Sequence, residues 1–320
     1  MRFFGAMLIR GVLLLCVFAG VMPAAGLGSV QAQSSPTTGE NVAARDAFER
    51  TLAADPHNLA AQEGEVQVSE RLALAARAAG DKDTALTALL RAQKFAPENA
   101  RLLYDLGILE DEMRLYRDAD LTLAHLWEID TTNPKVLYAV ARVKLDLGQL
   151  APAEENMKAY LEVKPNDPTA HYALGRIYQE GLQFDKAKAE FERSIQLQPV
   201  QTEAYYQVGD IAIQQHNYAE ALANFDKTLS RNPRHGGALA GSGIACFKLK
   251  QYEKAEEFLD KAISAAPDYQ PGHYYLGLTL ARLGKKTEAE REFSVATQLA
   301  NQDNSQGANR LRLVPPTESR

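Results

Sequence analysis

The sequence has few of the residues that metal, redox and hydrolytic enzymes use. Its 320 residues include 2 cysteines and 6 histidines, and the histidines form neither an i, i+4 pair nor a His-Glu-x-x-His motif. Phosphate-binding loops and haem-attachment motifs are also absent from the sequence. Gly241-Ser242-Gly243 resembles part of a nucleophile elbow, but Ala240 stands where that motif needs glycine. We therefore expect no enzyme activity, no metal site and no cofactor.

The chain also lacks an excess of basic residues. It carries 35 Lys and Arg against 41 Asp and Glu. Removal of Arg2 and Arg10 with an N-terminal signal would leave 33 basic residues and a net charge of -8. An acidic balance disfavours nucleic acid and anionic membrane surfaces as partners.

Residues 1–32 have the composition of a secretory signal peptide. Arg2 and Arg10 flank the start of this segment, which contains an apolar run of 12 residues from Gly11 to Met22 and no acidic residue. The run is shorter than the ~20 residues that a spanning helix needs, so an uncleaved anchor is the weaker alternative. A lipoprotein signal at Cys16 is disfavoured because Leu15 precedes it. We expect cleavage after residue 32 and a periplasmic or secreted protein without a stable membrane span.

A period of 34 residues runs through most of the remaining chain. With Pro168 as position 1 of a unit, small residues recur at positions 8 and 20, a bulky residue at 24 and proline at 32. Small residues allow helices to approach closely, and proline ends a helix. The pattern of residues therefore predicts two antiparallel helices in each unit, at about positions 2–14 and 18–31. Position 20 is alanine in every unit: Ala85, Ala119, Ala153, Ala187, Ala221, Ala255 and Ala289.

These columns resemble the tetratricopeptide repeat family. Its motif has Leu-Gly at positions 7 and 8, Tyr at 11, Ala at 20, Phe at 24 and Pro at 32, matched here by Leu174, Gly175, Tyr178, Ala187, Phe191 and Pro199. The resemblance implies an all-α superhelix of seven full helix-turn-helix repeats with an N-terminal half repeat. The expected units are 66–99, 100–133, 134–167, 168–201, 202–235, 236–269 and 270–301.

The segments outside these units differ in composition. Residues 33–40 are polar and predict a flexible linker. Residues 302–320 predict a partly disordered tail, in which Leu311 and Leu313 belong to a short capping helix. Cys246, the one cysteine beyond the signal, falls on the packed face of a unit, so we expect a buried, unreactive thiol.

Residues 41–65 predict a half repeat that is out of phase with the rest. Ala44 lies 41 residues before Ala85, whereas the repeat needs 34. We place the seven extra residues, about two helical turns, in a long helix from about Leu59 to Ala79. Asn58 is its expected cap, and Gly64 its weakest point. A seven-residue loop before an ordinary helix is the alternative.

Positions 2, 5, 9 and 12 of each first helix form a second stripe, which lines the concave groove in the family. Position 5 carries Tyr104, Tyr138, Tyr172, Tyr206 and Tyr274, and position 9 includes Arg142, Arg176 and Asp210. Rigid aromatics beside alternating charges suit an extended peptide. In the alternative interpretation, the tyrosines only pack against the adjoining unit.

The resemblance thus implies a non-catalytic interaction module or scaffold in a bacterial-type cell envelope. Its expected partner is a protein or peptide in the concave groove. One alternative is a structural subunit of an envelope assembly, secretion, pilus or polysaccharide-export complex, including one associated with the membrane. An enzyme with an unrecognised site is the remote alternative.

Overall fold

The computed structural model describes residues 37–131 and 133–306, and over these residues the chain forms fifteen α-helices and no β-strand. A single helix, α1 (Thr38–Ala54), precedes seven antiparallel pairs. The pairs are α2 (Leu59–Ala78) with α3 (Lys82–Gln93), α4 (Ala100–Glu112) with α5 (Tyr116–Ile129), α6 (Pro134–Asp146) with α7 (Leu150–Val163), α8 (Pro168–Glu180) with α9 (Phe184–Leu197), α10 (Thr202–Gln214) with α11 (Tyr218–Arg231), α12 (Gly236–Lys248) with α13 (Tyr252–Ala265), and α14 (Gln270–Arg282) with α15 (Lys286–Gln306). The predicted all-α superhelix is confirmed.

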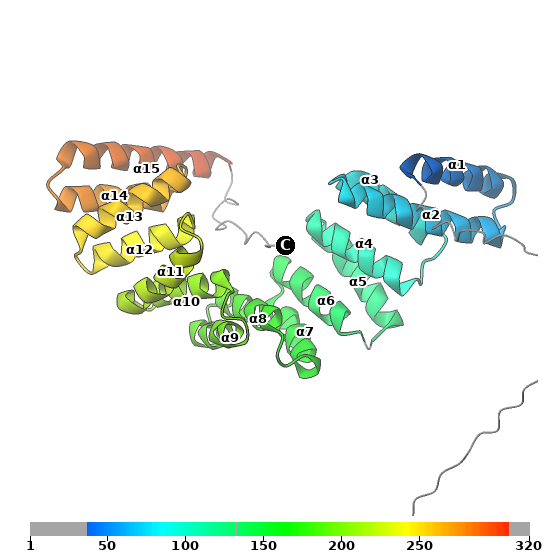
Figure 1. Ribbon diagram of the computed structural model, residues 1–320, viewed down its shortest axis with the longest axis horizontal. Helices are drawn as coiled ribbons and strands as arrows, with labels where there is room; N and C mark the ends of the chain where they lie inside the picture. The colour runs from blue at the N-terminus through cyan, green and yellow to red at the C-terminus, as the bar shows by residue number, and fades with distance from the viewer. Residues whose placement is uncertain (1–36, 132, 307–320) are drawn as a thin grey trace, which may run out of the picture.

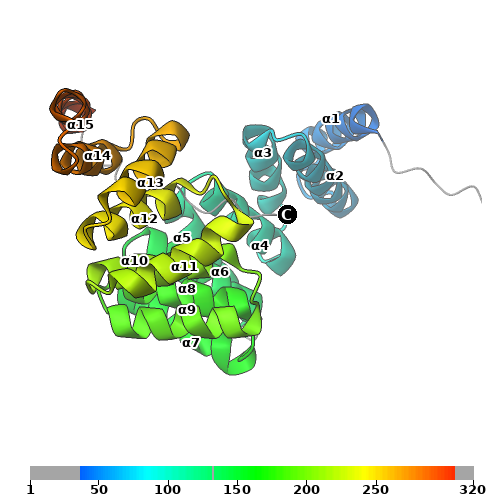
Figure 2. The ribbon, with the colours of Figure 1, turned by 60° about the vertical axis from the view of Figure 1, so that its left-hand side comes forward.

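The pairs stack into an arch, with α1–α3 at one end, α14 and α15 at the other, and α7–α9 at the bend (Figure 1). Each helix contacts its neighbours in sequence. The first helices of successive units also contact each other, as α4 does α6 and α10 does α12. The first helices therefore form the inner side of the curve. In Figure 2, α8–α11 are seen from the side whereas α15 is seen end-on, so the pairs rotate as the stack bends.

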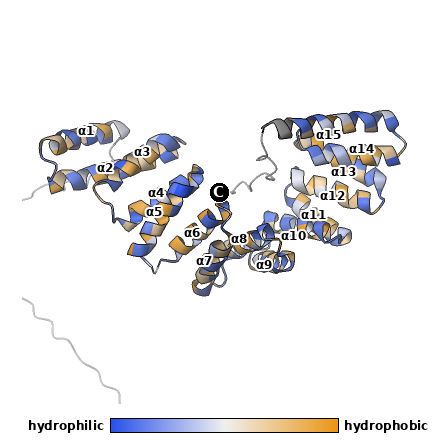
Figure 3. Ribbon diagram, turned by 180° about the vertical axis from the view of Figure 1, so that it is seen from behind, coloured by the Kyte–Doolittle hydropathy of each residue, from blue (hydrophilic) through white to orange (hydrophobic). Residues whose placement is uncertain are grey.

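Amphipathic helices hold the stack together, since polar and apolar residues alternate around them (Figure 3). The alanine at position 20 lies in the core of every unit: its exposed fraction is 0% in six units and 3% for Ala289. No unit can bury its apolar face alone, so neighbouring units provide one continuous core.

The turn between the two helices has the same backbone geometry in every unit. The residue at position 15 lies in the left-handed region in all seven units: Gly80, Arg114, Gly148, Leu182, His216, Lys250 and Gly284. The next N–H then donates to the carbonyl of position 11, as from Gln183 to Tyr178 at 2.8 Å. This bond caps the first helix. A left-handed conformation costs a residue other than glycine about 1–2 kcal/mol, so the helix pair must maintain it in four of the units.

The seven extra residues lie in α2, where the long helix was expected. α2 has 20 residues, whereas the other first helices have 13. The Asn58 side chain caps it by accepting from Ala61 N–H at 3.0 Å. The helix continues through Gly64, which makes room for the ring of Phe48 from α1, where a Cβ atom would clash. The two added turns lengthen α2, which contacts both α1 and α3.

Both ends of the described structure extend beyond the predicted boundaries. Helix α1 begins at Thr38, within the predicted linker 33–40, because Thr37 and Glu40 form a capping box. Helix α15 runs to Gln306, past the expected end of the last unit at 301. The predicted signal, residues 1–32, and the expected capping helix around Leu311 and Leu313 lie outside the described residues.

Two further features of the described residues are the burial of Cys246 and the hydropathy of the helices. The thiol of Cys246 is buried, as expected, and burial raises its pKa. Within 37–131 and 133–306, none of the helices combines the length and apolarity that crossing a bilayer requires.

The two helices of a unit fit together through a size match between positions 8 and 24. A Cβ atom on Gly175 would lie 2.7 Å from the ring of Phe191, so we expect Gly175→Ala to destabilise the protein by about 1–3 kcal/mol. The unit 134–167 combines Ala141 with Met157 at these positions, and both are fully buried. Adding Phe191→Met should therefore recover much of the loss. Urea denaturation of the two single variants and the double variant measures the coupling, and strictly additive losses would contradict the size match.

Candidate functional site

The predicted stripe lies on the first helices, which form the inner side of the arch (Figure 1). Tyr104 is in α4, Tyr138 and Arg142 in α6, Tyr172 and Arg176 in α8, Tyr206 and Asp210 in α10, and Tyr274 in α14. Successive first helices therefore place these side chains along one inner surface.

Four of the five tyrosine rings of the stripe pack against other aromatic rings. Tyr172 lies 5.4 Å from Phe191 between ring centroids, and Tyr206 lies 4.7 Å from His235, the residue that caps α12. Tyr138 and Tyr274 have comparable partners in the second helix of their own units. Exposure nevertheless varies widely, from 6% for Tyr206 to 44% for Tyr274. The rings thus stabilise the scaffold, and Tyr274 presents the most exposed ring of the four.

The centre of the inner face carries a polar patch on α8 and α10, which we call the central patch: Tyr172, Arg176, Gln179, Gln207 and Asp210. Gln179 Nε2 donates to Asp210 Oδ2 at 3.4 Å, and Gln207 Nε2 donates to the Tyr172 hydroxyl at 3.5 Å. Arg176 lies 3.5 Å from Glu180 within the same helix. The two hydrogen bonds are at the upper limit of hydrogen-bond length and the ion pair is longer than a charge-assisted hydrogen bond, so these contacts are weak. Arg176 also forms a hydrogen bond with Tyr172.

Burial sets the electrostatics of the central patch. Desolvation raises the pKa of Asp210, and the positive charge of Arg176 opposes that rise. Desolvation also raises the pKa of Tyr172. A half-buried carboxylate and a guanidinium whose ion-pair and amide contacts are long are a favourable arrangement for charged or hydrogen-bonding groups of a ligand.

Several charged pairs elsewhere on the stack are shorter. Lys188 of α9 and Glu220 of α11, on the second helices, are 2.5 Å apart. On the inner face, Arg142 is already committed to Asp111 of the preceding unit at 2.9 Å, and the Asp111 side chain is 3% exposed. Arg142 therefore stabilises the junction of two units, whereas Arg176 and Asp210 remain available for another partner.

Sequence reasoning named three of the five residues of the central patch. Gln179 occupies position 12 of its unit and so belongs to the predicted stripe, but only the charged and aromatic residues of that stripe were singled out. Gln207 occupies position 6, outside the stripe, and is 8% exposed. Its contact with Tyr172 crosses between units, and a single repeat motif gives no signal for such a contact.

The arrangement offers recognition groups and no reactive centre that we can identify. Within the described ranges there is no group of three or more His, Cys, Asp or Glu side chains that could hold a metal ion. His171 and His273 form hydrogen bonds to Glu190 and Glu292, respectively, each at 2.6 Å. Each ring also contacts a proline carbonyl, so both imidazoles tie the two helices of their unit to the preceding loop.

Comparisons with known proteins agree with this architecture. Residues 168–201 and residues 212–274 each match a tetratricopeptide repeat model. No curated protein matches the chain at a significant level. Among solved structures, a tetratricopeptide repeat protein from Parabacteroides merdae is 18% identical with a TM-score of 0.60, over 75% of this chain and 95% of that one.

Two further structures share the fold. Pseudomonas aeruginosa pilF is 18% identical with a TM-score of 0.55, over 66% of this chain and 93% of that one. A chain of the APC/C hetero-tetramer Cut9-Hcn1 is 14% identical with a TM-score of 0.60, over 82% of this chain and 50% of that one. At these identities the likeness concerns the fold alone. With its period, its helix pairs and the two matched segments, the chain belongs to the tetratricopeptide repeat family.

Proposed function

We propose that the protein is a non-catalytic scaffold that binds an extended segment of a partner protein along its inner face. The observation that carries the proposal is the central patch, where Arg176 and Asp210 are half-buried and their contacts with Glu180 and Gln179 are 3.5 and 3.4 Å long, while Arg176 also hydrogen-bonds Tyr172. A partner segment that brings an acidic group to Arg176 and a donor to Asp210 would replace these long contacts by short ones.

The two ends of the inner stripe indicate what flanks the charged centre. Position 9 is apolar on both sides of Arg142, Arg176 and Asp210, with Leu74 and Ile108 before them and Ile244 and Leu278 after them. Leu74 is 71% exposed. The partner segment is therefore expected to carry apolar residues on either side of a polar centre.

The place of action is also part of the proposal. Residues 1–32 have the pattern of an export signal, and we propose that the scaffold acts in the periplasm or outside the cell. The net charge of -8 expected after removal of residues 1–32 is consistent with protein partners rather than nucleic acid.

Selection of peptides against the full chain, followed by titration of the best binder, tests the inner face. The double variant Arg176→Ala, Asp210→Ala is expected to bind the selected peptide tenfold or more weakly, a loss of about 1.4 kcal/mol, because two charge-assisted contacts are lost. The matched control, Lys188→Ala with Glu220→Ala, removes one charge of each sign from the second helices. Equal losses in both double variants, or no loss in the first, would contradict binding at the central patch.

A further inference from the structure

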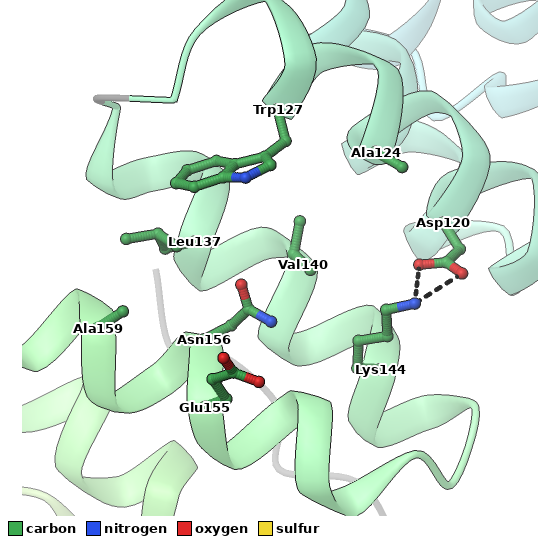
Figure 4. A pocket seen from close by; sticks show the side chains of 9 residues that line it. All are labelled: Asp120, Ala124, Trp127, Leu137, Val140, Lys144, Glu155, Asn156 and Ala159. Atoms are coloured by element: carbon green, nitrogen blue, oxygen red, sulfur yellow. Dashed lines mark hydrogen bonds and ion pairs between the residues drawn. The ribbon is translucent and has the colours of Figure 1, made fainter.

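A second recognition surface lies between α5 and α7, with α6 as its floor, on the side of α6 that faces away from the inner stripe (Figure 4). We call it the Trp127 groove. It encloses about 380 Å³, within the range of small ligand pockets. Trp127, the only tryptophan of the chain, lies at one end on α5, and Leu137 and Val140 of α6 line the floor.

Two alanines line the groove, and no other junction between the seven units has alanine at both of these positions. Ala124 stands at position 25, where the other units before the last have larger residues: Leu90, Lys158, Glu192, Asp226 and Asp260. Ala159 stands at position 26, where the other units have Arg91, His125, Arg193, Lys227, Lys261 and Val295. Both alanines line the groove, one on each wall. The missing side chains leave the space over the α6 floor open.

Of the charged side chains that line the groove, two form an ion pair and one has no partner among the described residues. Lys144 on the floor is paired with Asp120 of α5 at 2.8 Å, so its charge is neutralised. Glu155 on the α7 wall is exposed, and none of the hydrogen bonds or ion pairs found among the described side chains involves it. Of the charged residues that line the groove, Asp120 and Glu155 are acidic and Lys144 is basic. The groove therefore combines an aromatic ring, an apolar floor and an unpaired carboxylate.

We propose that the Trp127 groove binds an arginine or lysine side chain of a partner protein, at an interface separate from the central patch. The apolar stem of such a side chain would cover Leu137 and Val140, while its cationic head would contact the Trp127 ring and Glu155. Because Lys144 is paired with Asp120, the carboxylate of Glu155 leaves the lining with a net negative charge, which complements a basic partner side chain.

The fluorescence of the full-length chain tests the proposal, because Trp127 is its sole tryptophan. The probe is a capped peptide, Ala-Leu-Arg-Leu-Ala, and its counterpart has glutamine in place of arginine. The arginine peptide is expected to give a saturable change in emission, with about tenfold weaker binding for the glutamine peptide. No saturable change, or equal binding of both peptides, would overturn the proposal.

Variants assign the binding to the groove. Ala159→Arg places in the groove the residue that Arg193 supplies in the next unit, so it should abolish binding while leaving the melting temperature unchanged. Glu155→Gln should weaken binding about fivefold or more. Arg176→Ala with Asp210→Ala should leave this binding intact, and a loss there would contradict a separate interface.

The chain itself contains one competing occupant, the sequence Arg310-Leu311-Arg312-Leu313. In the Arg310→Gln, Arg312→Gln variant, the peptide is expected to bind with unchanged affinity. A shift in Trp127 emission without peptide, together with tighter peptide binding, would assign the groove to the chain's own C-terminal segment and overturn the assignment to a partner protein.

Discussion

Phe225→Ala is expected to lower the free energy of unfolding by about 3–5 kcal/mol, the largest loss among the substitutions considered. The Phe225 side chain is 1% exposed. Its ring fills the space left by Gly209 in the first helix of its own unit, where a Cβ atom would lie 2.6 Å from a ring carbon, and also packs against Gly241 of the next unit. Removal of the ring therefore leaves a cavity both within a unit and between units.

The position of that cavity determines how the variant unfolds. Contacts in a repeat stack are restricted to neighbouring units, so a weakened junction separates the stability of the two sides. Urea denaturation followed by far-UV circular dichroism is expected to show an early transition that Trp127 fluorescence, which reports on α5, does not follow. Phe225→Leu is the control, because leucine fills the same position in other units, as in Leu259. A loss below about 1 kcal/mol for Phe225→Ala would contradict the packing described.

Glu110→Gln is expected to stabilise the protein by about 3 kcal/mol at pH 8 and to have little effect near pH 4. Glu110 is 4% exposed, and its Oε2 atom has no hydrogen-bond partner among the described groups. Burial raises the pKa of this carboxyl from 4.5 to about 7; Asp118 adds to the rise, and a hydrogen bond from Thr122 opposes it. The protonated form is therefore favoured in the folded protein.

The sign of the pH dependence follows from that shift. The stabilisation from a neutral Glu110 is fully present below pH 4.5, declines as the unfolded chain ionises, and is lost above about pH 7. Glutamine has the shape of the glutamate side chain and cannot ionise. The difference in unfolding free energy between the variant and the parent should therefore grow between pH 4.5 and pH 7. Denaturation at pH 4, 6 and 8 measures it, with Glu128→Gln, an exposed carboxylate of α5, as the control. A constant difference at all three values would contradict a buried ionisation.

The periodic columns predict this fold because they record the contacts that every unit repeats. The alanine at position 20 is buried in each unit, and helix pairs form where the columns place them. The long helix α2 could be predicted because an insertion of seven residues is close to two full turns and keeps the apolar face in place. The packing role of Gly64 could not be predicted from the helix alone, because the residue that fills its space, Phe48, belongs to another helix.

Features that differ from unit to unit were harder to predict. The left-handed residue at position 15 is glycine in three units only, so Leu182 or Arg114 gives no turn signal. The weak contacts of Arg176 and Asp210 depend on which side chains lie across the junction, as do the burial of Glu110 and the opening of the Trp127 groove. A residue type that recurs at one position of the repeat shows which helix face that position occupies. The contacts of each residue depend on other positions in the neighbouring units, which vary from unit to unit.

Photocrosslinking tests the central claim, that the inner face binds a partner, without knowledge of that partner. Photoreactive p-benzoylphenylalanine in place of Arg176 of α8, or of Lys188 of α9 as the comparison, is introduced into the full chain in its native cells. The account predicts a discrete crosslinked protein from position 176 and none from position 188. Crosslinking from position 188 alone, or from neither position, would contradict it.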